Sequence, residues 1–134
     1  MPLRCRIDEE ADLVVTTAEG PVTAEDLLAH ARTLVRTPNR PTRELVDFSD
    51  RVEITVPTDA VRRTARLLAD EDANAAGSRV AMVAKTNAVF GLMRLFEVYR
   101  EHSSVAVRVF RDREEARRWL DAEQAVAPGA TARE

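Results

Sequence analysis

The sequence predicts an α/β domain built on a mixed sheet, and residues 79–100, RVAMVAKTNAVFGLMRLFEVYR, carry most of that prediction. The small apolar run 80–84 is typical of a strand covered on both faces, and residues 85–87 can stop it and cap a helix. A buried strand followed by an apolar helix indicates parallel pairing. The chain has 134 residues, 45% of them hydrophobic, so it has the size of one domain with a substantial core.

Composition and charge exclude several classes of protein. A net charge of -3 with 32% charged residues lacks the basic footprint of a nucleic-acid binder, so nucleic acid is not an expected partner. Cys5 is the single cysteine, which excludes an internal disulfide and a four-cysteine zinc site. The first residues lack the apolar core of a signal peptide, and no apolar run reaches the ~18 residues that span a bilayer. We therefore expect a cytoplasmic protein without an integral membrane segment.

The N-terminal third predicts a hairpin followed by a helix. Apolar and polar residues alternate from 3 to 8, which is typical of a half-buried edge strand, and the chain turns back into a second strand over 13–17. Gly20 and Pro21 are expected to break that strand. Thr23 is placed to cap an amphipathic helix that lies on the surface.

The middle of the chain predicts a strand over 44–48, closed by residues 49 and 50. Residues 52–56 run into a proline and are interpreted as an extended connection. Thr58 can cap a helix over the residues that follow, and the acidic residues 70–72 oppose the helix dipole, so we expect an early end.

The remaining elements complete a sheet of five strands. The helix that follows Asn87 is followed by a last strand over 105–110, and Asp112 with Glu115 resembles a capping box for a final helix. We expect Phe96 and Trp119 to be buried. Right-handed crossovers predict strands in sequential order, only the first antiparallel to its neighbour, and helices mainly on one face. The domain is expected over 1–124, with a disordered tail over 125–134.

Polar side chains gather where the parallel strands end, which is where ligands bind in open α/β sheets. Helix amides and a lysine at this edge could hold an anion. The alternative is that these residues are ordinary caps and turns. The candidate ligand-binding residues are Asp47, Ser49, Thr58, Lys85, Thr86 and Asn87.

Other polar residues have simpler explanations. His30 follows Asp26 by four residues, so a surface pair is expected rather than a metal ligand, and no other ligand lies at metal-binding spacing. Cys5 is interpreted as a small core residue, and the arginines at 62, 63 and 66 as a solvated helix face. No nucleophile elbow, C-x-x-C pair or glycine-rich phosphate loop is present. The sequence therefore predicts no catalytic residue, no cofactor and no metal.

The helix that follows Asn87 has more apolar residues than one face can hold. Phe90, Leu95 and Val98 lie outside the stripe that faces the core, and together they would form an apolar patch. A symmetric homodimer would cover that patch. The alternative is that the second and fourth helices of the same chain flank this helix and bury Leu95 and Val98.

Four short segments resemble the SpoIIAA-like family of the STAS type, whose fold is shared with CRAL-TRIO lipid-binding domains. They are GPVTAEDL at 20–27, LVDF at 45–48, AVFGLMRLFE at 88–97 and VFRDREEARRWL at 109–120. The resemblance covers about residues 3–122. None of these segments is a catalytic signature, so the resemblance implies a fold first.

The resemblance also implies a regulatory function, and the residues and the resemblance together leave three hypotheses. STAS-type antagonists bind a kinase partner and are switched by phosphorylation in an Asp-Ser-Ser-Gly segment, which is absent here, so Thr58, and less plausibly Ser49 or Thr55, would take that role. The first hypothesis is a non-enzymatic regulatory module that acts through a protein partner or small ligand at the carboxyl edge of the sheet. The second is a carrier of an apolar or lipid-like ligand, and the third is an enzyme that uses Asp47 and Lys85.

Overall fold

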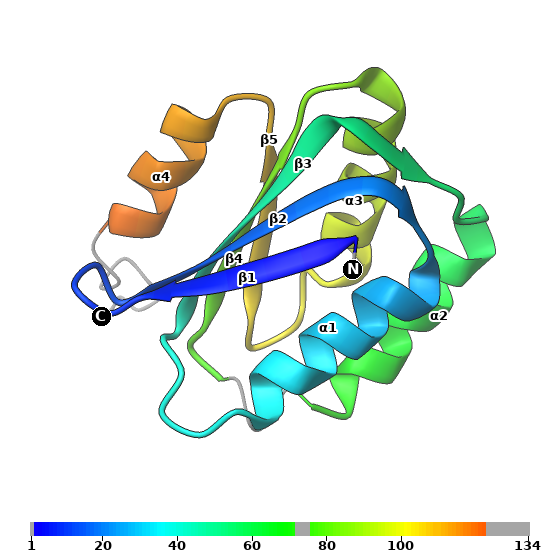
Figure 1. The fold of residues 1–134 in the computed structure, drawn as a ribbon. Coiled ribbons are helices and arrows are strands. Elements are labelled where there is room, and N and C mark those ends of the chain that lie inside the picture. The colour runs from blue at the N-terminus through cyan, green and yellow to red at the C-terminus, as the bar shows by residue number, and fades with distance from the viewer. Residues whose placement is uncertain (1, 72–75, 123–134) are drawn as a thin grey trace.

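The computed structural model describes residues 2–71 and 76–122, and these form a five-stranded sheet with four helices (Figure 1). In chain order the elements are β1 Leu3–Asp8, β2 Leu13–Val22, α1 Ala24–Arg36, β3 Arg43–Ile54, α2 Thr58–Ala69, β4 Arg79–Ala84, α3 Asn87–Tyr99, β5 Ala106–Phe110 and α4 Arg113–Asp121. The predicted tail over 125–134 lies outside the described residues.

The sheet confirms the predicted topology. Its strands follow the order β1-β2-β3-β4-β5. β1 pairs with β2 in antiparallel fashion, and every later pair is parallel. β4, the small apolar run, lies inside the sheet between β3 and β5, where both of its faces are covered.

The helices cover the two faces of the sheet unequally. α1, α2 and α3 lie on one face and α4 lies on the other (Figure 1). Successive residues of β3 alternate between the two cores, as strand geometry requires: Val46 and Phe48 pack on the face of α3, and Leu45 packs with Ala116 and Leu120 of α4. The prediction of helices mainly on one face is confirmed.

β2 and β3 are both longer than predicted. Gly20, at φ +78°, allows a bulge after Ala18, and the parallel pairing continues beyond it from Gly20–Val52 to Val22–Ile54. Pro21 is tolerated because β1 pairs only as far as Ala18, so no strand on that side needs its missing N–H. The predicted break at Gly20 and Pro21 is therefore wrong, and residues 52–54 of the predicted extended connection at 52–56 belong instead to β3.

The predicted caps are partly confirmed. Thr23 and Asp26 form a complete capping box at the start of α1. Thr86 caps α3 by accepting a hydrogen bond from the amide of Val89. Thr58 is not a cap, because Pro57 occupies that position and Thr58 is the first helical residue. Asp112 stands at the cap position of α4 but makes no side-chain cap hydrogen bond.

Two arginines at the start of β3 and β4 hold the end of α4. Arg79 is buried and donates from Nη1 to the carbonyls of Trp119 and Ala122, at 2.7 and 3.0 Å, beneath the Trp119 ring. Arg43 donates to the carbonyl of Leu120 at 3.0 Å and also contacts the carbonyl of Ala11. Burial, and then the nearby Arg43 guanidinium, lowers the pKa of Arg79. These bonds satisfy carbonyls that a helix end leaves unpaired.

Three residues expected in the core are more exposed than predicted. Phe96 and Trp119 are only partly buried, each at the margin of one core. Cys5 is exposed, because β1 is an edge strand with a neighbour on one side only.

Candidate functional site

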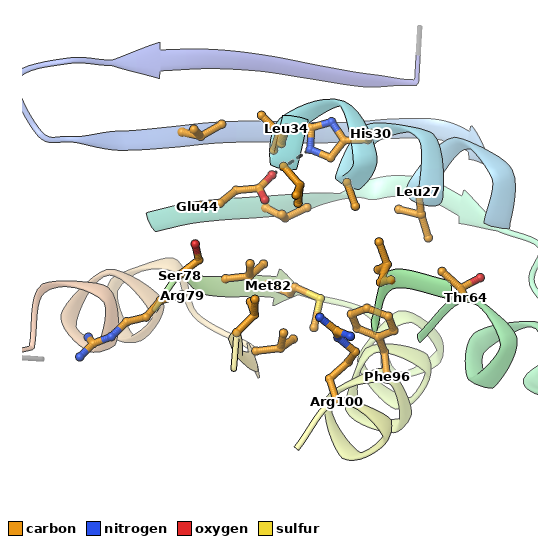
Figure 2. A pocket seen from close by; sticks show the side chains of 18 of the residues that line it. Leu27, His30, Leu34, Glu44, Thr64, Ser78, Arg79, Met82, Phe96 and Arg100 are labelled. Carbon is orange, nitrogen blue, oxygen red and sulfur yellow. Dashed lines mark hydrogen bonds and ion pairs between the residues drawn. The ribbon is translucent and has the colours of Figure 1, made fainter. Parts of the chain in front are cut away.

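A cavity of about 150 Å³ lies between the sheet and the helices α1, α2 and α3 (Figure 2). Apolar side chains form most of its wall. They come from every element around it, and include Leu27 and Leu34 of α1, Leu68 of α2, Phe96 of α3 and Met82 of β4. A closely packed interior leaves few voids larger than a water molecule, so a space of this size is unusual in a domain of this length.

The cavity exists because α1 does not pack tightly on the sheet. α1 has a clear apolar face, yet none of its residues is fully buried. Leu27, Ala31 and Leu34, one turn apart along that face, all line the cavity and all remain partly exposed. On the other side of the cavity, by contrast, Val46 and Met82 of the sheet are almost fully buried. α1 therefore covers the cavity on the side opposite the sheet.

One polar cluster stands in this apolar wall. His30 of α1 places Nε2 at 2.8 Å from Glu44 Oε2 of β3, and Thr16 of β2 donates its hydroxyl to the same oxygen at 2.7 Å. Nε2 also lies 3.2 Å from the Thr16 hydroxyl oxygen. Thr16 is fully buried, and the side chains of His30 and Glu44 are 16% and 14% exposed. Figure 2 shows His30 and Glu44 facing each other, from α1 and β3 respectively.

The prediction that His30 pairs with Asp26 on the surface is wrong. Asp26 is occupied in the capping box, and His30 points to the sheet. The helical phase contained this signal: with Leu27, Ala31 and Leu34, His30 lies at the i, i+3, i+4, i+7 spacing of the apolar face. Its partner was harder to find, because Glu44 is 14 residues away on another element.

Further charged side chains around the cavity form ion pairs or hydrogen bonds with neighbouring residues. Glu71, also buried, binds Arg36 at 2.7 Å and lies 3.9 Å from Arg32, tying the loop after α2 to α1. Arg40 donates to the carbonyl of Pro41 at 2.9 Å and lies 3.5 Å from the hydroxyl of Ser78. Arg100, buried at the end of α3, donates to the carbonyl of Ala65 at 3.3 Å.

The residues predicted at the carboxyl edge divide among different partners. Asp47 binds Arg113 of α4 at 2.7 Å, and within the described residues its Oδ1 is buried with no hydrogen-bond partner. Asn87 Oδ1 accepts a hydrogen bond from Arg111 at 2.8 Å.

The other edge residues are dispersed. Thr86 caps α3, Lys85 is exposed, and Ser49 belongs to β3. Thr58 is exposed at the start of α2, on the opposite face of the sheet from α4, which Asp47 contacts. The structure thus does not bring Asp47 and Thr58 to one rim. Ligand binding at this edge and phosphorylation of Thr58 stay predictions.

The extra apolar residues of α3 are covered to different degrees. Val98 is 42% exposed, whereas Phe90 and Leu95 are partly buried. The Arg111 guanidinium lies over the Phe90 ring, 4.2 Å from its centre. A homodimer through this surface stays a prediction.

Comparison with solved structures identifies the fold. The chain is similar to the crystal structure of an uncharacterised protein of the DUF3478 family, with a SpoIIAA-like fold, from Shewanella loihica PV-4. The two share 21% identity and a TM-score of 0.52 over 88% of this chain and 93% of the other. This chain has a SpoIIAA-like fold. No protein-family model and no curated protein matches the sequence.

The SpoIIAA-like fold confirms what the four sequence segments implied about architecture. It assigns no ligand, because the similar protein is itself described only by its fold. The relation to CRAL-TRIO domains remains an expectation from the sequence resemblance. Among residues 2–71 and 76–122, no helix has the length and apolar character to cross a membrane, and no group of three or more His, Cys, Asp or Glu could hold a metal ion.

Proposed function

We propose that this protein is a non-enzymatic binding module that takes a small apolar ligand into the cavity beneath α1. The observation that carries the proposal is the cavity itself: about 150 Å³, with apolar walls, under a helix whose whole apolar face stays incompletely buried. Apolar pockets with a few convergent polar groups are the usual form of small-molecule sites. Here the cavity wall includes the hydrogen-bonded pair of His30 and Glu44, and Thr16 of β2 binds the same carboxylate.

The volume limits the ligand. For comparison, an engineered protein cavity of about 150 Å³ lined by Leu, Ile and Phe binds benzene or xenon. A single aromatic ring or a short alkyl chain fits this space, and a long-chain lipid does not. The carrier hypothesis therefore takes the form of a small apolar ligand.

The two other hypotheses have less support. The residues predicted at the carboxyl edge do not converge on one ligand site, because Asp47 pairs with Arg113 and Asn87 with Arg111. An enzyme using Asp47 and Lys85 would need these two side chains to converge, whereas Asp47 pairs with Arg113. A regulatory role through a protein partner, in the cytoplasm, is compatible with ligand binding, since a ligand that favours one position of α1 would change the surface that a partner meets.

Toluene is a suitable probe, followed by methyl NMR during titration. The two cores on opposite faces of the sheet give an internal control. We expect shifts at Leu27, Leu34 and Met82, which line the cavity, and none at Leu13 and Leu120 in the core beneath α4. Unchanged spectra, or equal shifts in both cores, would overturn the proposal.

A further inference from the structure

Resting on the proposed function, the geometry points to the chemical class of the ligand: we infer that the cavity selects a small apolar molecule carrying an uncharged hydroxyl group, whose hydrogen is accepted by Glu44. The inference starts from the hydrogen bonds of Glu44. Both donors from the protein, the Thr16 hydroxyl at 2.7 Å and His30 Nε2 at 2.8 Å, use the same oxygen, Oε2. Glu44 itself lines the cavity.

The second carboxylate oxygen is the acceptor that remains. Within the described part of the chain, Oε1 of Glu44 accepts no hydrogen bond, and it is not among the buried atoms that lack a partner. An ionised carboxylate only accepts hydrogen bonds, so its natural complement is a donor. A ligand hydroxyl meets that need without bringing a charge into an apolar space.

The charge of the site argues against an anionic ligand. A ligand carboxylate beside Glu44 would place two like charges together in a poorly solvated space. Four arginines also line the wall, and each donates to a backbone carbonyl: Arg40 to Pro41, Arg43 to Leu120, Arg79 to Trp119 and Arg100 to Ala65. They keep their positive charge, so the repulsion that a ligand carboxylate meets is the local one beside Glu44. An uncharged hydroxyl on an apolar body is the chemistry that fits both the wall and the polar cluster.

A purely structural role for the cluster is the competing explanation. His30 and Glu44 could serve only to tie α1 to β3. An apolar pair would fill such a position at least as well, since a buried ion pair is weak evidence for stability. The two explanations differ in one measurable quantity, the preference of the cavity between probes of one shape that differ by a hydroxyl.

Isothermal titration calorimetry with toluene, p-cresol and benzoate tests the inference. p-Cresol is toluene with one added hydroxyl, and benzoate supplies the anion on the same ring. A hydrogen bond to a charged acceptor makes p-cresol bind about tenfold tighter than toluene. We expect benzoate to bind more weakly than either.

The variant Glu44→Met removes the acceptor while keeping an unbranched side chain of similar length. We expect it to abolish the preference for p-cresol over toluene, and a circular dichroism spectrum equal to that of the wild type shows that the variant is folded. Glu53→Met, at an exposed position of the same strand, is the matched control and keeps the wild-type preference. If Glu44→Met does not fold, Glu44→Gln is tested instead. Its amide oxygen is a neutral acceptor, so we expect a smaller preference for p-cresol over toluene than in the wild type.

Each outcome separates the two proposals. Equal affinity for toluene and p-cresol, tightest binding of benzoate, or an undiminished preference in Glu44→Met and Glu44→Gln overturns the hydroxyl inference and leaves the apolar cavity standing. Failure of all three probes to bind overturns the proposed function and this inference with it.

Discussion

The imidazole of His30 and the carboxylate of Glu44 meet at 2.8 Å, and this contact joins α1 to β3 across one side of the cavity. No residue of α1 is fully buried, although Leu27 packs against the core, so this polar contact adds to a partial apolar contact. The polar cluster therefore has two consequences, one for the stability of α1 and one for what the cavity binds.

His30→Ala should lower the free energy of unfolding by about 1–3 kcal/mol, since it removes one of the two donors to a partly buried carboxylate. Urea unfolding followed by circular dichroism measures the effect. The control is His102→Ala, at a side chain that is 95% exposed. A loss no larger in His30→Ala than in the control would show that the contact does not stabilise α1.

Arg79→Met should loosen α4. The substitution removes the charged donor that the carbonyls of Trp119 and Ala122 share, and a hydrogen bond from a charged group contributes about 1.5–3 kcal/mol. The single tryptophan reports on this region, so we expect a weaker near-ultraviolet signal of Trp119 and faster amide exchange in α4. Arg94→Met, at an exposed arginine of α3, should leave both unchanged. If the amides of α4 exchange as slowly in Arg79→Met as in the wild type, Arg79 does not hold the end of α4.

Phe96→Ala should cost less than a fully buried phenylalanine does. Phe96 is partly buried and already borders the cavity, so its loss removes fewer contacts than the ~3–5 kcal/mol typical of buried phenylalanine. Phe48→Ala, at a side chain that is 1% exposed, should cost that full amount. Denaturant midpoints of the two variants give the comparison. Equal losses would mean that Phe96 packs as tightly as Phe48.

A homodimer through α3 is the remaining prediction about assembly. Light scattering at micromolar concentration should give twice the mass of one chain, and Val98→Glu should give a monomer, because a charge in an apolar interface is costly. Ile7→Glu alters an equally exposed apolar residue on β1 and should leave the dimer intact. A monomeric wild-type protein would contradict the prediction and leave α3 as an ordinary surface helix.

Much of the fold could be predicted from local patterns. The small apolar run predicted the buried strand β4, right-handed crossovers predicted the sheet order, and Thr23 and Thr86 indicated two helix starts. The bulge at Gly20 was missed, because a glycine before a proline has the same local signature whether the strand ends or continues. Only the pairing with β3 decides between these outcomes.

The candidate site was predictable to a smaller degree. The carboxyl-edge residues were chosen from topology, but Arg111 and Arg113 bind two of them, and those pairings depend on how α4 packs. The cavity has no sequence signature, since Leu27, Ala31 and Leu34 are what a tightly packed helix would also show. His30 was the one residue that departed from that pattern.

The central claim is that the space beneath α1 binds an apolar molecule, and calorimetric titration with toluene of two matched variants of α1 tests it most directly. Ala31→Leu places a larger side chain in the cavity, and Ala29→Leu makes the same change on the exposed side of the helix. We predict that the wild type and Ala29→Leu bind toluene with equal affinity, and that Ala31→Leu does not bind it. Unchanged binding by Ala31→Leu, or no binding by the wild type, would contradict the account.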